Sequence, residues 1–110
     1  ISAIRLPDFV ARRDFEWAVS EVERKKKTDC SKAEFMTVCE GLCVQIMHIG
    51  SYDNEPATIA LMDDFLEKNG YDNDITDERR HHEIYLSDPR RVAPERCKTV
   101  IRCPIRKRES

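Results

Sequence analysis

Residues 35–49 have the sequence FMTVCEGLCVQIMHI, in which two apolar runs lie on either side of the pair Glu40-Gly41. Apolar, β-branched runs separated by a two-residue turn are typical of a β-hairpin. We therefore predict strands over residues 35–39 and 42–49, joined by a turn. In such a hairpin Cys39 and Cys43 point to opposite faces of the sheet, which argues against a shared zinc ion.

A helix is predicted on each side of this hairpin. The first covers about residues 9–26, and the second begins at Pro56, a residue favoured in the first helical turn. The second ends at Gly70, which can adopt the left-handed conformation that follows many helices. The apolar sides expected to face a core contain Phe15, Ala18, Val19 and Val22 in the first helix, and Ile59, Met62, Phe65 and Leu66 in the second.

Three more strands complete the predicted order β-α-β-β-α-β-β. They cover residues 1–6, 82–86 and 98–103. This order implies an α+β fold, a mostly antiparallel sheet with helices on one face. The length of 110 residues suits a single domain.

The charge balance does not indicate a nucleic-acid-binding protein. The chain has 19 basic and 21 acidic residues, and its basic runs, 24–27 and 106–108, fall at the end of a helix and of the chain. No helix-turn-helix pattern with a basic recognition helix is present. We also find no apolar run long enough to span a membrane and no signal peptide.

The five cysteines bear on the cellular compartment of the chain, and its first residue bears on whether another segment precedes it. An odd number of cysteines without an export signal indicates reduced thiols in the cytoplasm. The chain begins with Ile1, not Met, and a predicted strand stands first with nothing before it to pair with. We therefore expect that an N-terminal portion precedes it.

Three segments resemble one protein family when taken together. They are EGLCVQIMHIGSYDNEP at 40–56, HEIYLSDP at 82–89 and KTVIRCPI at 98–105. They are similar to the C-terminal half of a GyrI-like small-molecule-binding domain. This bacterial module occurs alone, in gyrase-inhibitory proteins, and fused to DNA-binding domains in multidrug-sensing transcription regulators.

The resemblance implies a fold of two tandem pseudo-repeats with a ligand groove between them. Residues 34–106 would form the second pseudo-repeat, residues 1–33 the strand–helix segment before it, and the first pseudo-repeat would lie upstream of Ile1. The exposed sheet edge that remains favours pairing with a second chain, so a homodimer is expected.

Glu83 is the principal candidate for a ligand-binding residue. On a strand, Glu83 and Tyr85 share one face, while Ile84 and Leu86 share the other. If Ile84 and Leu86 face the helices, Glu83 and Tyr85 face the family's groove. There the resemblance gives Glu83 the role of a pocket acid that binds amphipathic, cationic or aromatic small molecules. The alternative is a solvated Glu on an ordinary strand.

Two more aromatic residues are candidates for the same groove. Tyr52 either packs at the entrance of the second helix or reaches the ligand. Trp17 lies off the apolar stripe of the first helix, so it either contacts a partner or loop or forms a wall for a ligand. His81 and Glu83 lie on one face of the strand and His82 lies on the other, so the three cannot bind one metal ion, and we expect no metal. We expect no other cofactor either.

Two other functions remain open. Some stand-alone members of the family hydrolyse electrophilic toxins that carry a cyclopropane, and Glu83 would then be the general base. No second carboxylate with motif support was found for that role. The third alternative is a protein-interaction module that binds gyrase or itself.

Overall fold

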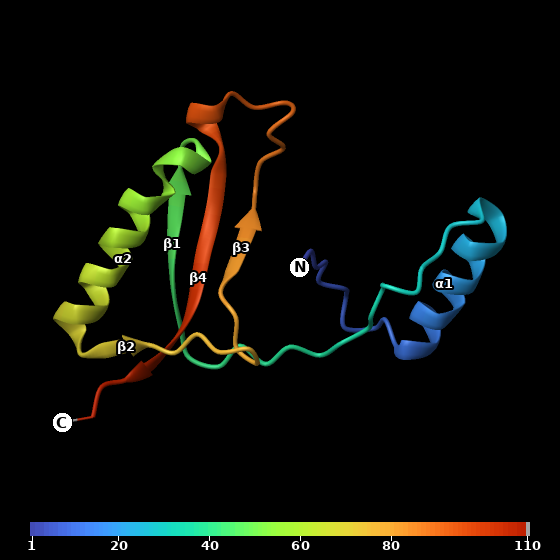
Figure 1. Ribbon diagram of the computed structural model, residues 1–110, viewed down its shortest axis with the longest axis horizontal. Coiled ribbons are helices and arrows are strands. Elements are labelled where there is room, and N and C mark those ends of the chain that lie inside the picture. Colours follow the sequence, from blue (N-terminus) through green and yellow to red (C-terminus); the bar gives the residue numbers. More distant parts are fainter. Residues whose placement is uncertain (110) are drawn as a thin grey trace. The chain divides into compact units, whose positions relative to one another are not determined.

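The structure is a computed structural model that describes residues 1–109 (Figure 1). The chain forms two compact units, and the division between them falls between Val38 and Cys39. Within residues 1–109, neither α-helix has the length and apolar content that a bilayer span requires.

The first unit contains helix α1, Arg12–Lys26. Asp14 accepts a 2.8 Å hydrogen bond from the backbone N–H of Ala11 and so caps the first turn. Phe15 stacks on Phe35, with 5.7 Å between ring centroids, and the Arg12 guanidinium lies 5.4 Å from the centre of the Phe35 ring. These contacts explain why α1 remains attached to the segment 30–36, although no residue of α1 is fully buried.

Two predicted strands are absent from this unit. Neither residues 1–6 nor residues 35–39 form a strand. A strand needs a partner edge to satisfy its backbone groups, and residues 1–38 contain no sheet. Phe35 contributes instead to the contact with α1.

The second unit is built around one long strand. β4, Lys98–Lys107, pairs antiparallel with β1, Cys43–Ile49, with β3, His82–Tyr85, and with β2, Tyr71–Asn73. β1 pairs with residues 98–104 of β4, and β3 pairs with residues 99–102 from the opposite side. β2 follows on residues 105–107. The predicted antiparallel sheet is therefore confirmed, although no strand was predicted for the residues of β2.

The predicted hairpin at Glu40-Gly41 is wrong. The strand partner of β1 is β4, about fifty residues further along the chain, and not residues 35–39. The backbone carbonyl of Leu42 already accepts a 3.0 Å hydrogen bond from the N–H of Ile105. The long β4 offers a partner to every residue of β1, so long-range pairing prevails over the local turn signal.

Helix α2, Glu55–Asn69, covers one face of this sheet (Figure 1). Its buried residues are Met62 and Leu66, and Met62 joins a core with Ile101 and Cys103. Ile59 and Phe65, also predicted to face the core, are 36% and 52% exposed. The predicted end of the helix is confirmed: Gly70 is left-handed, with φ 76° and ψ 34°. A 3₁₀ turn, η1 at Tyr52–Asn54, leads into α2, and a second, η2 at Pro94–Arg96, precedes β4.

Candidate functional site

The register of β3 on β4 decides which way Glu83 and Tyr85 point. Glu83 lies opposite Ile101, and Tyr85 lies opposite Thr99. Directly opposed residues of an antiparallel pair point to the same face. Ile101 packs against Met62 of α2, so Glu83 and Tyr85 lie on the face that α2 covers.

This orientation corrects the expectation that Ile84 and Leu86 face the helices. Ile84 lies opposite Val100, which in turn lies opposite Met47, and Met47 is 44% exposed on the uncovered face. Leu86 is 56% exposed. The alternation of a strand fixes which residues share a face, but not which of the two faces meets a helix.

Glu83, Tyr85 and Tyr52 come together at this place. The Tyr85 hydroxyl donates a 2.7 Å hydrogen bond to Oε2 of Glu83. That bond, helped by partial burial, raises the pKa of Tyr85 to about 12, because the hydroxyl gives up its proton less readily beside a carboxylate. The Tyr52 ring meets the Tyr85 ring edge-on, with 6.0 Å between centroids and 84° between planes.

A buried histidine holds the loop that carries Tyr52. His48, on β1, is 2% exposed, and its Nε2 lies 2.7 Å from the backbone carbonyl of Ser51. A carbonyl only accepts, so Nε2 carries a proton and donates. Nδ1 lies 2.6 Å from the hydroxyl of Thr58, on α2. His48 therefore connects β1, the loop before η1 and the first turns of α2.

Glu55 is the residue of this site that the sequence did not indicate. It is the first residue of α2, and its Oε1 is buried without a hydrogen-bond partner among residues 1–109. Burial raises the pKa of the Glu55 carboxyl, and the adjacent Glu83 carboxyl raises it further, while His48 acts in the opposite direction. An acidic residue in the first helical turn is ordinarily explained by the helix dipole, so nothing in the pattern singled it out.

Trp17 belongs to the first unit. It lies on α1 and is 68% exposed. A shallow hollow of about 350 Å³ in the same unit is lined by Phe15, Val19 and Cys30, among others, but not by Trp17. The role of Trp17 as a wall for a ligand stays a prediction.

A second group of polar contacts lies at the entrance to β1 and has a structural role. The Arg102 guanidinium donates to both carboxylate oxygens of Glu40 at 3.1 Å, and His82 Nδ1 lies 2.8 Å from Oε1 of Glu40. Arg102 is the main reason why the pKa of Glu40 lies below its ordinary value. His82 is thus engaged with Glu40. Across residues 1–109, no three His, Cys, Asp or Glu side chains are placed to hold a metal ion.

A model of the GyrI-like small molecule binding domain matches residues 7–106, and the chain belongs to this family. Among solved structures, a hydrolase from Listeria innocua is 43% identical, with a TM-score of 0.85 over 93% of this chain and 52% of that one. An uncharacterized conserved protein from Listeria innocua is 44% identical, with a TM-score of 0.86 over 93% of this chain and 50% of that one.

The chain therefore spans about half the length of these relatives. No curated protein matches the sequence. The suspected resemblance to the GyrI-like family is confirmed, and small-molecule binding is the general role that the family carries.

Proposed function

We propose that this chain binds amphipathic small molecules, cationic or aromatic, at the group formed by Glu83, Tyr85 and Tyr52, and that organic cations suit it best. The observation that carries the proposal is the Glu83 carboxyl, held by the Tyr85 hydroxyl at 2.7 Å. Among residues 1–109, Glu83 takes part in no ion pair, so its charge is available to a ligand.

The two tyrosines supply the apolar part of such a site. Tyr52 and Tyr85 are 45% and 58% exposed, and their edge-on contact fixes both rings beside the carboxyl. A cation over an aromatic face gains about 0.5–2 kcal/mol, more as it is desolvated. A carboxylate next to two rings is therefore suited to a cation that also carries an apolar surface.

The opposite wall of the site would come from a second chain. The exposure of Tyr52 and Tyr85 leaves the group open on one side. Within the second unit, β3 has a strand partner on one side only, so its free edge borders the site. We propose a homodimer in which a partner chain covers this edge.

A fluorescence titration with ethidium tests the binding function. The native chain is expected to bind in the micromolar range, and Glu83→Gln is expected to lose about tenfold in affinity, or ~1.4 kcal/mol. Glu78→Gln is the matched control, because it makes the same chemical change at an exposed residue outside the group. Equal affinities for the native chain and Glu83→Gln would contradict the role of Glu83.

Hydrolysis is the second candidate function. It is favoured by the relative that is described as a hydrolase and by the presence of a second carboxyl, Glu55, beside Glu83. Glu83 would act as general base and take a proton from the attacking water. Incubation with a cyclopropane-bearing electrophile, followed by mass spectrometry, distinguishes the two functions. A binder returns the compound unchanged, whereas a hydrolase yields a product heavier by one water.

A further inference from the structure

Glu55 has the chemistry of a carboxyl that retains its proton. Its Oε1 is buried and has no hydrogen-bond partner among residues 1–109. An ionised carboxylate oxygen in that position would lose its hydration without compensation, which is costly, whereas a protonated carboxyl is neutral and has a hydrogen to donate. The Glu83 carboxyl is the neighbour that would accept it.

Of the groups around Glu55, His48 in its charged form favours an ionised Glu55, and the others do not. On β3, the Tyr85 hydroxyl is already donated to Glu83. On β1, His48 opposes the rise in the pKa of Glu55, but its ring nitrogens contact Ser51 and Thr58 rather than either glutamate. Tyr52, in η1, is neutral and packs against Tyr85. In the described part of the chain, neither glutamate forms an ion pair with Lys or Arg.

We propose that Glu55 keeps its proton while Glu83 is ionised and donates it to the Glu83 carboxylate, and that a bound organic cation displaces this proton. The two carboxyls then present one negative charge in the empty site and two in the occupied site. This inference rests on the binding function proposed above. In it, Glu55 supplies a second negative charge only when a cation is bound.

The proposal makes cation binding dependent on pH. A ligand that favours the ionised form of Glu55 lowers the proton affinity of that carboxyl, and by linkage its own affinity rises with pH until Glu55 is ionised in the empty site. At a pH where Glu55 is protonated in the empty site and ionised in the occupied site, each bound cation releases a proton to solvent. In a chain without a carboxyl at position 55, this rise of the cation affinity with pH disappears.

The protonation of Glu55 is tested without any ligand. In the full chain with ¹³C-labelled glutamate carboxyls, the resonance of Glu55 is the one that is missing from the spectrum of Glu55→Gln. Its pKa is expected to lie above 4.5, the ordinary value of a glutamate carboxyl. In Glu83→Gln that titration is expected to move to lower pH, because the accepting carboxylate is gone. Glu78→Gln should leave it unchanged. A Glu55 resonance that titrates at its ordinary value would overturn the proposal.

The exchange with a cation is tested with ethidium, whose charge is permanent. The affinity of the native chain should rise by up to about tenfold as pH passes through the titration of Glu55. Glu55→Gln should show no rise in that range, and equal pH profiles of the two chains would overturn the exchange. If ethidium binds at no pH, the binding function and the exchange both fail, while the carboxyl titration still decides whether Glu55 retains its proton.

Discussion

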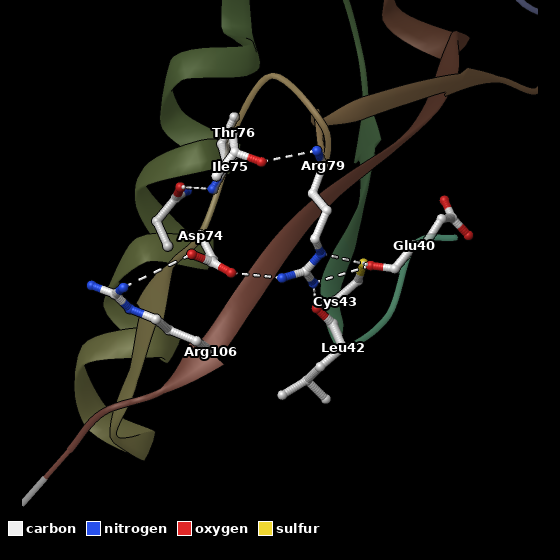
Figure 2. Close-up of polar contacts among 9 residues, drawn as sticks. Glu40, Leu42, Cys43, Asp74, Ile75, Thr76, Arg79 and Arg106 are labelled. Atoms are coloured by element: carbon white, nitrogen blue, oxygen red, sulfur yellow. Dashed lines mark hydrogen bonds and ion pairs between the residues drawn. The ribbon is translucent and has the colours of Figure 1, made fainter. Parts of the chain in front are cut away.

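Arg79 connects the segment after β2 to the segment that enters β1 (Figure 2). Its Nη2 donates to the backbone carbonyls of Leu42 at 2.8 Å and Glu40 at 3.0 Å, and its Nη1 donates to Asp74 at 2.6 Å. The planar guanidinium reaches all three acceptors at once, and 27% of the side chain is exposed. Arg79 thereby fixes residues 40–42, which no hairpin partner holds in place.

We expect Arg79→Lys to destabilise the fold by about 1–3 kcal/mol, because an ammonium group cannot satisfy acceptors in these three directions. Urea unfolding followed by circular dichroism measures the change. Arg80→Lys is the matched control, since Arg80 is exposed and, within residues 1–109, its guanidinium donates only to the carbonyl of Asp77. A loss of stability no larger than that of the control would contradict the role given to Arg79.

At the level of single residues, the sequence brought together part of the candidate site, whose role stays a prediction. Alternation along 82–86 was enough to place Glu83 and Tyr85 together, and the loop after residue 50 pointed to Tyr52. Glu55 could not be found this way, because its burial depends on how the start of α2 meets β3, two segments almost thirty residues apart. No local pattern encodes that contact.

The end of α2 illustrates how one glycine shapes an element. Gly70 has φ 76°, a conformation in which L side chains are strained, and its N–H donates to the carbonyl of Leu66. A Cβ added at Gly70 would meet no atom within 4 Å, so a substitution there changes the backbone strain and little else.

Gly70→Ala is expected to cost about 1–2 kcal/mol, the penalty of a left-handed residue. Gly70→Asn should lose less, because Asn tolerates this conformation better than Ala. Thermal unfolding of the three chains gives the order Gly, Asn, Ala in falling midpoint. If Ala and Asn are equally stable, the strain is not the cause.

At the level of elements, the sequence predicted those that depend on local periodicity and missed those that depend on a distant partner. The two helices and the strands containing His82 and Lys98 follow from spacing and from Pro and Gly at helix ends. The hairpin at Glu40-Gly41 failed because β1 pairs with β4, and β2 was missed because residues 71–73 are polar and become a strand only against 105–107.

For the whole molecule, the α+β class and the antiparallel sheet were predicted correctly from the alternation of helical and extended patterns. The division between Val38 and Cys39 was not predicted, because residues 35–39 had been assigned to the sheet. The arrangement as half of a tandem pseudo-repeat stays a prediction.

The proposed homodimer is tested by sedimentation velocity on the full chain over the micromolar range. We expect a dimer, because the free edge of β3 borders an open site and is followed directly by Leu86, which is 56% exposed. Leu86→Lys is expected to shift the equilibrium to monomer, whereas Leu61→Lys, at the 64% exposed Leu61 on α2, should not. A native chain that sediments as a monomer throughout would contradict the proposal.

The sheet has one further consequence, which concerns its synthesis. Within residues 1–109, β1, β2 and β3 each pair with β4 and with no other strand, and β4 is the last of the four along the chain. On the ribosome, the first three strands emerge before their common partner exists. The sheet therefore cannot form until residues 98–107 have left the exit tunnel, and until then the first three strands stay unpaired or in temporary contacts.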